Sequence, residues 1–186
     1  MKISDRGFWD TNSYNRHHWD ESMCDALIKM AIKKDVKTAI DLGCGNGYYT
    51  KRLLDSGIFC VGYDGNPNTQ QITNGLCGII DLSKPFALNQ YDLVLSLEVG
   101  EHIPREFEQI FIDNICGCAG RHIVISWAIP GQSGTGHVNC RENSWVIEQM
   151  KSRNFSQTDD SNILRESVST CDWFKNTILT FEKDEK

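Results

Sequence analysis

The sequence lacks the features that mark several common classes of protein. No apolar run approaches the roughly 18 residues of a membrane-spanning helix, so we expect no membrane segment. The first residues, MKISDRGFWD, are polar and aromatic, which argues against a secretory signal peptide and favours a cytoplasmic protein. No repeat and no Pro/Gly-rich linker divides the 186 residues. Because a domain usually takes roughly 100–200 residues, we expect a single domain.

The sequence also has no excess of basic residues. It contains 25 Asp and Glu against 19 Lys and Arg, which gives a net charge of −6. Nucleic-acid-binding domains usually carry a basic face. The acidic balance therefore argues against nucleic acid as a partner, although a local basic patch is compatible with an acidic total.

The 8 cysteines include no C-x-x-C pair, so neither a zinc framework nor a small disulfide scaffold is indicated. Most of them lie in apolar stretches such as IFCVGY and LCGIID, where a thiol behaves as a small hydrophobe. We expect reduced, structural cysteines, as in a cytosolic protein.

Short apolar runs alternate with helical patterns along most of the chain. The apolar runs predict buried strands at residues 38–42, 58–64, 76–82, 91–99 and 122–129. Helical spacing of apolar residues, or a proline that opens a helix, predicts helices at residues 21–34, 48–56, from 67, from 104 and at 143–153. Such alternation favours parallel strands with right-handed crossovers and helices on both faces.

The end of the chain shows a different pattern. The runs NILRESVST and NTILTFEK have no clear helix between them and predict an antiparallel strand pair at the edge of the sheet. We therefore expect an α/β fold with an open, mostly parallel, seven-stranded Rossmann-like sheet. Its predicted parts are a helical or lid segment, a cofactor-binding core, an acceptor-side loop and a C-terminal helix with the strand pair, at residues 1–36, 37–129, 130–142 and 143–186.

A glycine-rich turn follows the first predicted strand, at the edge where open sheets bind ligands. The sequence there is DLGCGNGYY, beginning at Asp41. The dinucleotide fingerprint G-x-G-x-x-G requires a glycine where Tyr48 stands, and no Gly-Lys-Ser/Thr follows for a phosphate-binding loop. The pattern is instead G-x-G-x-G with an acid two residues before the first glycine.

This turn resembles the first motif of the class I S-adenosylmethionine-dependent methyltransferases. The resemblance continues at Asp64, Asp81-Leu82 and YDLV at residues 91–94, each at a predicted strand. It implies that Asp64 accepts the ribose hydroxyls and that Asp81-Leu82 holds the adenine. The cofactor contacts implied in this way are Asp41, Gly43, Cys44, Gly45, Asp64, Gly65, Asp81, Leu82 and Leu97.

The segment before the first helix is rich in aromatic residues and histidine. Trp9, Tyr14, His18 and Trp19 are candidates for a lid over the cofactor, and we count Trp9 and His18 among its contacts. The alternative is a helix that packs apolar residues on the domain.

A second group of polar residues follows the fourth predicted strand, in the order Glu98-Val-Gly-Glu101-His102. Their spacing of i, i+3 and i+4 lets the side chains face one way on a turn, where two acids and an imidazole suit a divalent cation. His137, in the loop after the fifth strand, is a fourth candidate ligand. This set resembles the E-x-x-E-H stretch and later His of the small-RNA 2′-O-methyltransferases, and the acidic stretch of the ubiquinone-pathway O-methyltransferases.

Two interpretations of this group stay open. In the first, Glu98, Glu101, His102 and His137 hold magnesium, manganese or zinc, and the metal lowers the pKa of an acceptor hydroxyl. In the second, no metal binds, the acids pack at the edge of the cofactor, and a histidine acts as general base or proximity alone suffices. Arg141 could hold an anionic group of the acceptor, or could only stabilise its loop.

The function indicated is methyl transfer from S-adenosylmethionine to a hydroxyl of a small molecule. One alternative is methylation of an RNA terminus, against which the acidic balance counts. Another is a non-catalytic methyltransferase-like binding module, against which the full set of polar residues counts. The oligomeric state and the identity of the acceptor do not follow from the sequence.

Overall fold

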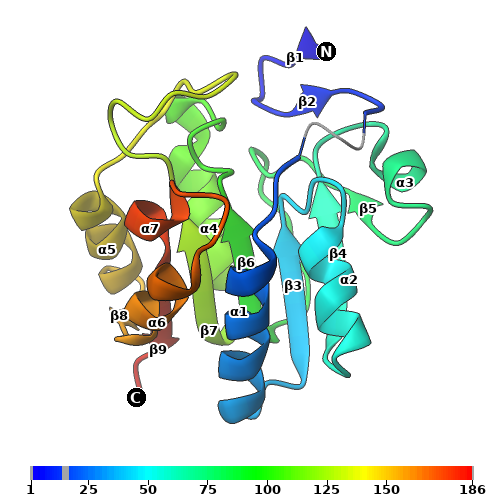
Figure 1. Cartoon of the computed structure of the whole chain (residues 1–186). Helices are drawn as coiled ribbons and strands as arrows, with labels where there is room; N and C mark the ends of the chain where they lie inside the picture. The colour runs from blue at the N-terminus through cyan, green and yellow to red at the C-terminus, as the bar shows by residue number, and fades with distance from the viewer. Residues whose placement is uncertain (1, 14–16, 186) are drawn as a thin grey trace.

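A seven-stranded sheet forms the centre of the computed structural model, which describes residues 2–13 and 17–185 (Figure 1). The strand order is β5-β4-β3-β6-β7-β9-β8. The five strands from β5 to β7 in this order are all parallel. Strand β9 runs antiparallel to both of its neighbours, β7 and β8. This confirms the predicted α/β class. The strands are Thr38–Leu42 (β3), Phe59–Asp64 (β4), Gly78–Ile79 (β5), Tyr91–Leu97 (β6), Ala119–Ser126 (β7), Phe155–Gln157 (β8) and Leu179–Lys183 (β9).

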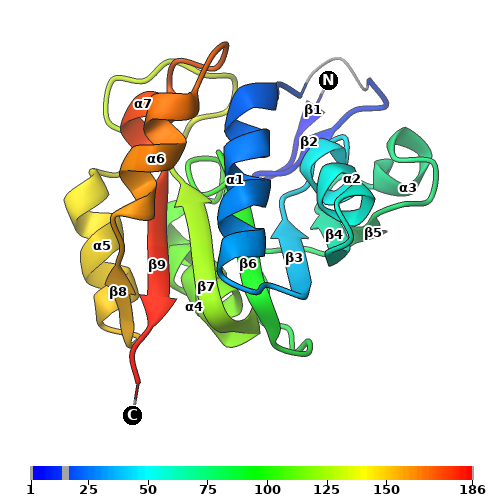
Figure 2. The same cartoon turned by 60° about the horizontal axis from the view of Figure 1, so that its bottom comes forward.

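Helices cover both faces of this sheet, and successive residues of β6 show why. Leu93 and Leu95 pack toward one core cluster, while Val94 packs toward the other, because side chains alternate along a strand. Helices α1, α2 and α6 lie on the first face and α4 and α5 on the second (Figure 2). The helices are Glu21–Lys33 (α1), Tyr48–Asp55 (α2), Thr69–Ile72 (α3), Glu108–Cys118 (α4), Asn143–Lys151 (α5), Asp160–Ser167 (α6) and Phe174–Thr177 (α7), with a 3-10 turn, Arg105–Phe107 (η2), before α4.

The N-terminal segment does not begin as a helix. Strands β1 (Lys2–Ile3) and β2 (Trp9–Asp10) form a small antiparallel hairpin apart from the main sheet. The hairpin lies beyond the carboxyl ends of the parallel strands (Figure 1). Tyr14, one of the four lid candidates, lies outside the described residues.

The prediction for the run 162–170 is wrong. Ser161, Leu164 and Val168 are buried at helical spacing, and residues up to Ser167 form α6. The strand that pairs with β9 comes earlier, at Phe155–Gln157. The short helix hidden in NILRESVST has only one apolar residue per turn facing the core, which is too weak a pattern to distinguish from a strand.

The third predicted strand is shorter than expected. Only Gly78–Ile79 pair with β4, because the chain turns directly afterwards, where the amide of Lys84 donates to the carbonyl of Asp81 at 3.1 Å. Among the described residues, no helix is long and apolar enough to cross a membrane.

Candidate active site

A cavity of about 640 Å³ lies at the carboxyl ends of β3, β4 and β6, beneath the N-terminal segment. This volume lies within the range of roughly 300–1,000 Å³ that is typical of small-molecule sites. The structure brings together on its walls fifteen of the sixteen residues predicted to bind or react. They are Trp9, His18, Asp41, Gly43, Cys44, Gly45, Asp64, Gly65, Asp81, Leu82, Leu97, Glu98, Glu101, His102 and His137.

The glycine turn forms one end of this cavity, the cofactor end. Gly43 and Gly45 have φ angles of +87° and +55°, which glycine adopts without steric cost. A Cβ on Gly43 would lie 2.3 Å from Cγ2 of Val99, so the turn is also too tightly packed for a side chain. The carboxylate of Asp64 holds the turn in place, because its Oδ2 accepts a hydrogen bond from the amide of Gly45 at 2.9 Å. These contacts leave the backbone of the turn facing the cavity.

Three acids reach the cofactor end, and their surroundings differ. Asp64 accepts a second hydrogen bond, from the amide of Asn66 at 2.9 Å. Asp41 is buried and accepts from the hydroxyl of Thr50 at 2.7 Å. Burial raises the pKa of Asp41 to about 7, although the hydrogen bond from Thr50 opposes the shift. The carboxylate that remains most available to a ligand is therefore that of Asp64.

Asp81 stands at the far edge of the same end. Its Oδ1 accepts hydrogen bonds from the amide and hydroxyl of Ser83 at 3.0 and 2.6 Å, and Lys84 lies 3.3 Å away. Burial raises the pKa of Asp81, but the bonds from Ser83 and the charge of Lys84 outweigh it, so the net pKa is lowered. Asp81 is therefore a charged group whose own loop already occupies part of its bonding capacity.

The turn after β6 builds the other end of the cavity, the acceptor end. Glu98 has a φ of +53°, a conformation that costs a non-glycine residue of the order of 1–2 kcal/mol. Its amide donates to the hydroxyl of Ser126 at 2.8 Å, which helps to hold the turn. Gly100 packs on the indole of Trp127, where a Cβ would lie 2.3 Å from ring carbons. This tight turn lets Glu101 and His102 reach the cavity side by side.

Glu101, His102 and His137 form the compact cluster at this end. One ligand atom from each residue lies within 4.8 Å of the others. Glu101 is fully buried, and neither of its carboxylate oxygens has a hydrogen-bond partner among the described residues. Nε2 of His137 lies 3.9 Å from Oε1 of Glu101. Burial, and then the charge of Glu98, raise the pKa of Glu101 well above its usual range.

Backbone carbonyls orient both imidazoles of the cluster. Nδ1 of His102 lies 3.2 Å from the carbonyl oxygen of Gly136, and Nδ1 of His137 lies 3.2 Å from that of Gln132. Because a carbonyl only accepts, each Nδ1 carries a proton, so the lone pair of the neutral form of either ring lies on Nε2. Burial lowers the pKa of His102 to about 4, so this ring is neutral at pH 7.

Glu98 stands next to the cluster rather than in it. Its Oε2 accepts from Nε2 of Gln132 at 2.6 Å, and its Oε1 accepts from the hydroxyl of Thr177 at 3.1 Å. Burial raises the pKa of Glu98, against these hydrogen bonds. The structure thus brings three of the four candidate ligands together and holds the fourth to one side.

The prediction that Arg141 contacts the acceptor is not supported. Arg141 is the one predicted site residue outside the cavity, and its guanidinium binds both carboxylate oxygens of Glu108 at 2.6 Å. It also lies over the ring of Trp145, with 4.3 Å from Cζ to the centroid. This arginine pins the acceptor-side loop to α4 and α5, which is the alternative that the sequence left open.

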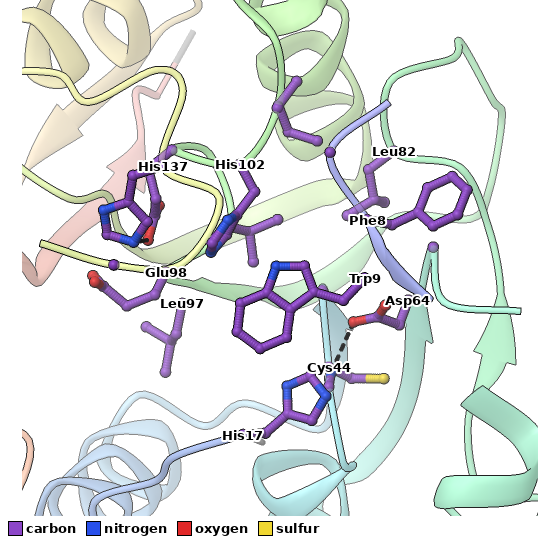
Figure 3. Close-up of a pocket in the computed structure, with 18 of the residues that line it drawn as sticks. Phe8, Trp9, His17, Cys44, Asp64, Leu82, Leu97, Glu98, His102 and His137 are labelled. Carbon is purple, nitrogen blue, oxygen red and sulfur yellow. Dashed lines mark hydrogen bonds and ion pairs between the residues drawn. The ribbon is translucent and has the colours of Figure 1, made fainter. Parts of the chain in front are cut away.

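The N-terminal segment closes the cavity with residues that the sequence interpretation missed. His17 packs on Gly45, and Phe8 packs on Gly65. Trp9 lies between the two ends, stacked on His17 at 5.6 Å and edge-on to His102 at 5.4 Å (Figure 3). The doublet of His17 and His18 was the available signal, but spacing does not tell which of two adjacent histidines packs on the glycine turn.

The other predicted lid residues behave differently from one another. His18 lines the cavity and contacts Trp173 edge-on, with 5.9 Å between the ring centroids. Trp19 stacks instead on Tyr48 of α2 at 5.0 Å and is not among the residues that line the cavity. The segment therefore covers the cavity with its first part and packs on the domain with its last.

Comparisons with known proteins agree with this arrangement. The sequence profile of a family described as "Methyltransferase domain" matches residues 15–118, which is more than half of the chain. The chain therefore belongs to this methyltransferase family.

The regions that match curated relatives span only part of the length of those proteins. A probable chloroplastic tocopherol O-methyltransferase of Oryza sativa subsp. japonica is 29% identical over 122 residues, which cover 58% of this chain and 34% of that protein. The chloroplastic tocopherol O-methyltransferase of Arabidopsis thaliana is 28% identical over 109 residues, 51% of this chain and 31% of that protein. The chain thus spans about a third of the length of these relatives.

Solved structures share the fold at low sequence identity. The magnesium protoporphyrin IX methyltransferase of Synechocystis PCC 6803, with bound SAH, superposes with a TM-score of 0.65 at 18% identity, covering 87% of this chain and 82% of that one. An amino pentose methyltransferase of Micromonospora echinaspora, with bound SAM, superposes with a TM-score of 0.67 at 8% identity, covering 91% and 93%. These likenesses establish the class I methyltransferase fold.

Proposed function

We propose that this protein transfers a methyl group from S-adenosylmethionine to a hydroxyl of a small molecule. The observation that carries the proposal is the single cavity in which the glycine turn and Asp64 lie at one end and the Glu101–His102–His137 cluster at the other. A methyl donor and a hydroxyl acceptor must meet in line, and one cavity with two polar ends suits such a meeting.

At the cofactor end, Asp64 has the capacity to bind a ribose. Each of its oxygens accepts one backbone amide, and each carboxylate oxygen has a second lone pair for a ribose hydroxyl. The glycine turn brings backbone groups to the cavity without a side chain in the way. Phe8, Trp9 and His17 line the cavity from the N-terminal segment and would cover a ligand bound there.

The cluster at the acceptor end fits a divalent cation. The two orphaned carboxylate oxygens of Glu101 are otherwise a costly feature, because a buried carboxylate needs a partner. Nδ1 hydrogen bonds to carbonyls, as found for His102 and His137, are the usual support of metal-binding histidines. A bound metal would lower the pKa of a hydroxyl and fix its lone pair. Two nitrogen ligands favour manganese or zinc over magnesium.

Without a metal, a histidine would have to remove the acceptor proton. His102 is a weak base for this purpose, because its pKa is about 4. His137 is the other candidate, since its Nδ1 faces the carbonyl of Gln132 and its Nε2 lies at the acceptor end. The metal-assisted form is thus the stronger proposal.

Calorimetry with S-adenosylmethionine and S-adenosylhomocysteine tests the cofactor. We expect binding of both, and the absence of binding by either would overturn the proposal. The metal is tested separately by titrating metal-free protein with manganese and with zinc and following the melting temperature. If neither ion raises the melting temperature and EDTA leaves activity unchanged, the metal is wrong and the methyl transfer stands.

The alternatives predicted from the sequence have their own tests. A steep salt dependence of RNA binding would favour the RNA-terminal acceptor. Turnover that survives loss of the cluster would show that these residues are not part of the chemistry. The cytoplasmic location stays a prediction.

A further inference from the structure

Two buried thiols meet behind the glycine turn, outside the roles described so far. Cys44 lies between Gly43 and Gly45, and Cys77 lies directly before β5. Their side chains share the space next to Gly62 of β4. A Cβ on Gly62 would lie 2.6 Å from Sγ of Cys77 and 3.2 Å from Cβ of Cys44. Both residues are almost fully buried, at 6% and 2% exposure, but Cys44 lines the cofactor cavity.

The two thiols are also chemically coupled. A hydrogen bond from Cys44 lowers the pKa of Cys77 and raises the pKa of Cys44 itself. Sγ of Cys77 lies 3.8 Å from the hydroxyl of Thr50, which donates to Asp41. Other buried thiols behave differently, since burial raises the pKa of Cys24 and of Cys116 to about 12. Two adjacent thiols, one of which lines a cavity, are an arrangement in which oxidation of the first sulfur leads to a disulfide with the second.

We propose that Cys44 and Cys77 form a disulfide when hydrogen peroxide enters the cofactor cavity, and that this disulfide weakens cofactor binding. The second half of the proposal rests on the proposed function, whereas the first half does not.

The chemistry balances with one peroxide for each pair. Cys44, the thiol that lines the cavity, loses its proton, its sulfur attacks one oxygen of hydrogen peroxide, the O–O bond breaks, and hydroxide leaves as Cys44 becomes a sulfenic acid. The sulfur of Cys77 then attacks that sulfur, the S–O bond breaks and water leaves. The protons of the two thiols convert the leaving oxygens to two waters, so the pair loses two electrons and the peroxide gains them.

The disulfide would distort the turn that faces the cofactor. A disulfide brings two sulfurs to about 2.05 Å, whereas hydrogen-bonded sulfurs stay well over 1 Å further apart. Cys44 would therefore have to move, although its amide donates to the carbonyl of Tyr63 at 3.0 Å and the next amide, of Gly45, donates to Asp64. A shift of this size at a binding turn is enough to lower affinity strongly.

The experiment treats the reduced full chain with hydrogen peroxide and maps disulfides by mass spectrometry under non-reducing conditions. Trypsin places Cys44 and Cys77 on different peptides, and subsequent chymotrypsin cleavage after Tyr63 separates Cys77 from Cys60. We expect a Cys44–Cys77 cross-link, a rise of at least tenfold in the dissociation constant of S-adenosylhomocysteine, and reversal of both by dithiothreitol. Prior saturation with S-adenosylhomocysteine should slow the cross-link.

Variants separate this pair from general oxidation. Cys77→Ala lies outside the cavity lining and should bind S-adenosylhomocysteine normally but lose its sensitivity to peroxide. Cys118→Ala, a matched change of a buried thiol in α4, should remain as sensitive as the wild type. Cross-links among other cysteines only, or a Cys44–Cys77 cross-link with unchanged affinity, would overturn the proposal. If the reduced protein binds no S-adenosylhomocysteine, the proposed function fails, and the cross-link still decides the disulfide.

Discussion

The two ends of the cavity satisfy their carboxylates in different ways. At the cofactor end, both oxygens of Asp64 accept backbone amides, and the acid helps to hold the glycine turn in place. At the acceptor end, Glu101 is more deeply buried, yet its oxygens have no hydrogen-bond partner among the described residues. The carboxylate at the cofactor end is therefore hydrogen-bonded before a ligand binds, whereas, in the described part of the chain, the carboxyl group at the acceptor end has no such partner until one binds.

The largest effect should come from Glu101→Gln. This change removes the carboxylate ligand of the cluster, and we expect turnover to fall by about 10³-fold or more. The melting temperature of metal-free protein should stay equal, because the raised pKa of Glu101 favours an uncharged acid, which the amide matches in charge and size. Turnover assays and thermal melts of the same sample check both. Glu148→Gln, a change of an exposed residue on α5, serves as control. An equal loss of turnover in this control would show that the effect of Glu101→Gln does not come from the acceptor end.

Asp64→Asn should weaken cofactor binding, by a smaller factor than the loss of turnover expected for Glu101→Gln. Two hydrogen bonds that ribose hydroxyls donate to a charged acceptor are worth about 3–5 kcal/mol together, so the dissociation constant of S-adenosylhomocysteine should rise at least 100-fold. Unlike the change at Glu101, this one should also lower the melting temperature, since Gly45 and Asn66 lose a charged partner. Calorimetry and melting measure the two, with the exposed Asp55→Asn as control. Unchanged affinity would remove Asp64 from the site.

The contact between the lid and the glycine turn can be tested by a double substitution. Gly45→Ala places a Cβ 2.6 Å from Nδ1 of His17, so it should weaken S-adenosylhomocysteine binding by about tenfold. His17→Ala in the same chain should recover part of that loss, because the clash is then gone. A double variant that is no better than Gly45→Ala would mean that His17 does not lie on the turn in solution.

The pH dependence of stability should reveal Asp41. The pKa of Asp41 in the folded protein is about 7, whereas an unfolded Asp titrates near 4, so the folded state binds more protons between these values. The free energy of unfolding therefore decreases as pH rises through this window, by up to about 1.4 kcal/mol per unit. Denaturant titrations from pH 4 to pH 8 should show a shallower decrease for Asp41→Asn. Parallel curves would contradict the raised pKa.

The smallest effect on chemistry should come from Arg141→Gln. Loss of the pair with Glu108 and of the contact with Trp145 should reduce the free energy of unfolding by about 1–3 kcal/mol. The KM for the acceptor should stay unchanged, because Arg141 does not line the cavity. A large rise in KM without loss of stability would restore the acceptor-binding role predicted from the sequence.

The sequence alone was a good guide wherever one short segment carries the information. Gly43 and Gly45 adopt positive φ angles, which the glycines of the motif already suggested. Asp64 ends β4 and Asp81 lies two residues after β5, and apolar runs in the sequence predicted both strands. Prediction was poorer where the pattern is short. α6 contributes one apolar side chain per turn to the core, and an extended strand was therefore predicted in its place.

The acceptor end could be predicted only in part for a different reason. Glu101 and His102 lie in one turn, so their spacing predicts that they lie together. His137 belongs to another loop, and its contact with them depends on how that loop folds. Glu98 is held outside the cluster by hydrogen bonds from Gln132 and Thr177, which lie 34 and 79 residues away in the sequence. Patterns of local spacing do not predict contacts over such separations. The two roles of Arg141 could not be told apart from the sequence, because its partner Glu108 belongs to a helix 33 residues earlier.

The sequence by itself determined the class of fold and the cofactor end, because backbone freedom at glycine and the order of apolar runs are local properties of the chain. Only the tertiary structure decided which histidine covers the turn, which carboxylate is left without a partner, and which two of the 8 cysteines meet. Each of these depends on burial and on distances between segments remote in sequence, and these exist only once the sheet has brought its strand ends together.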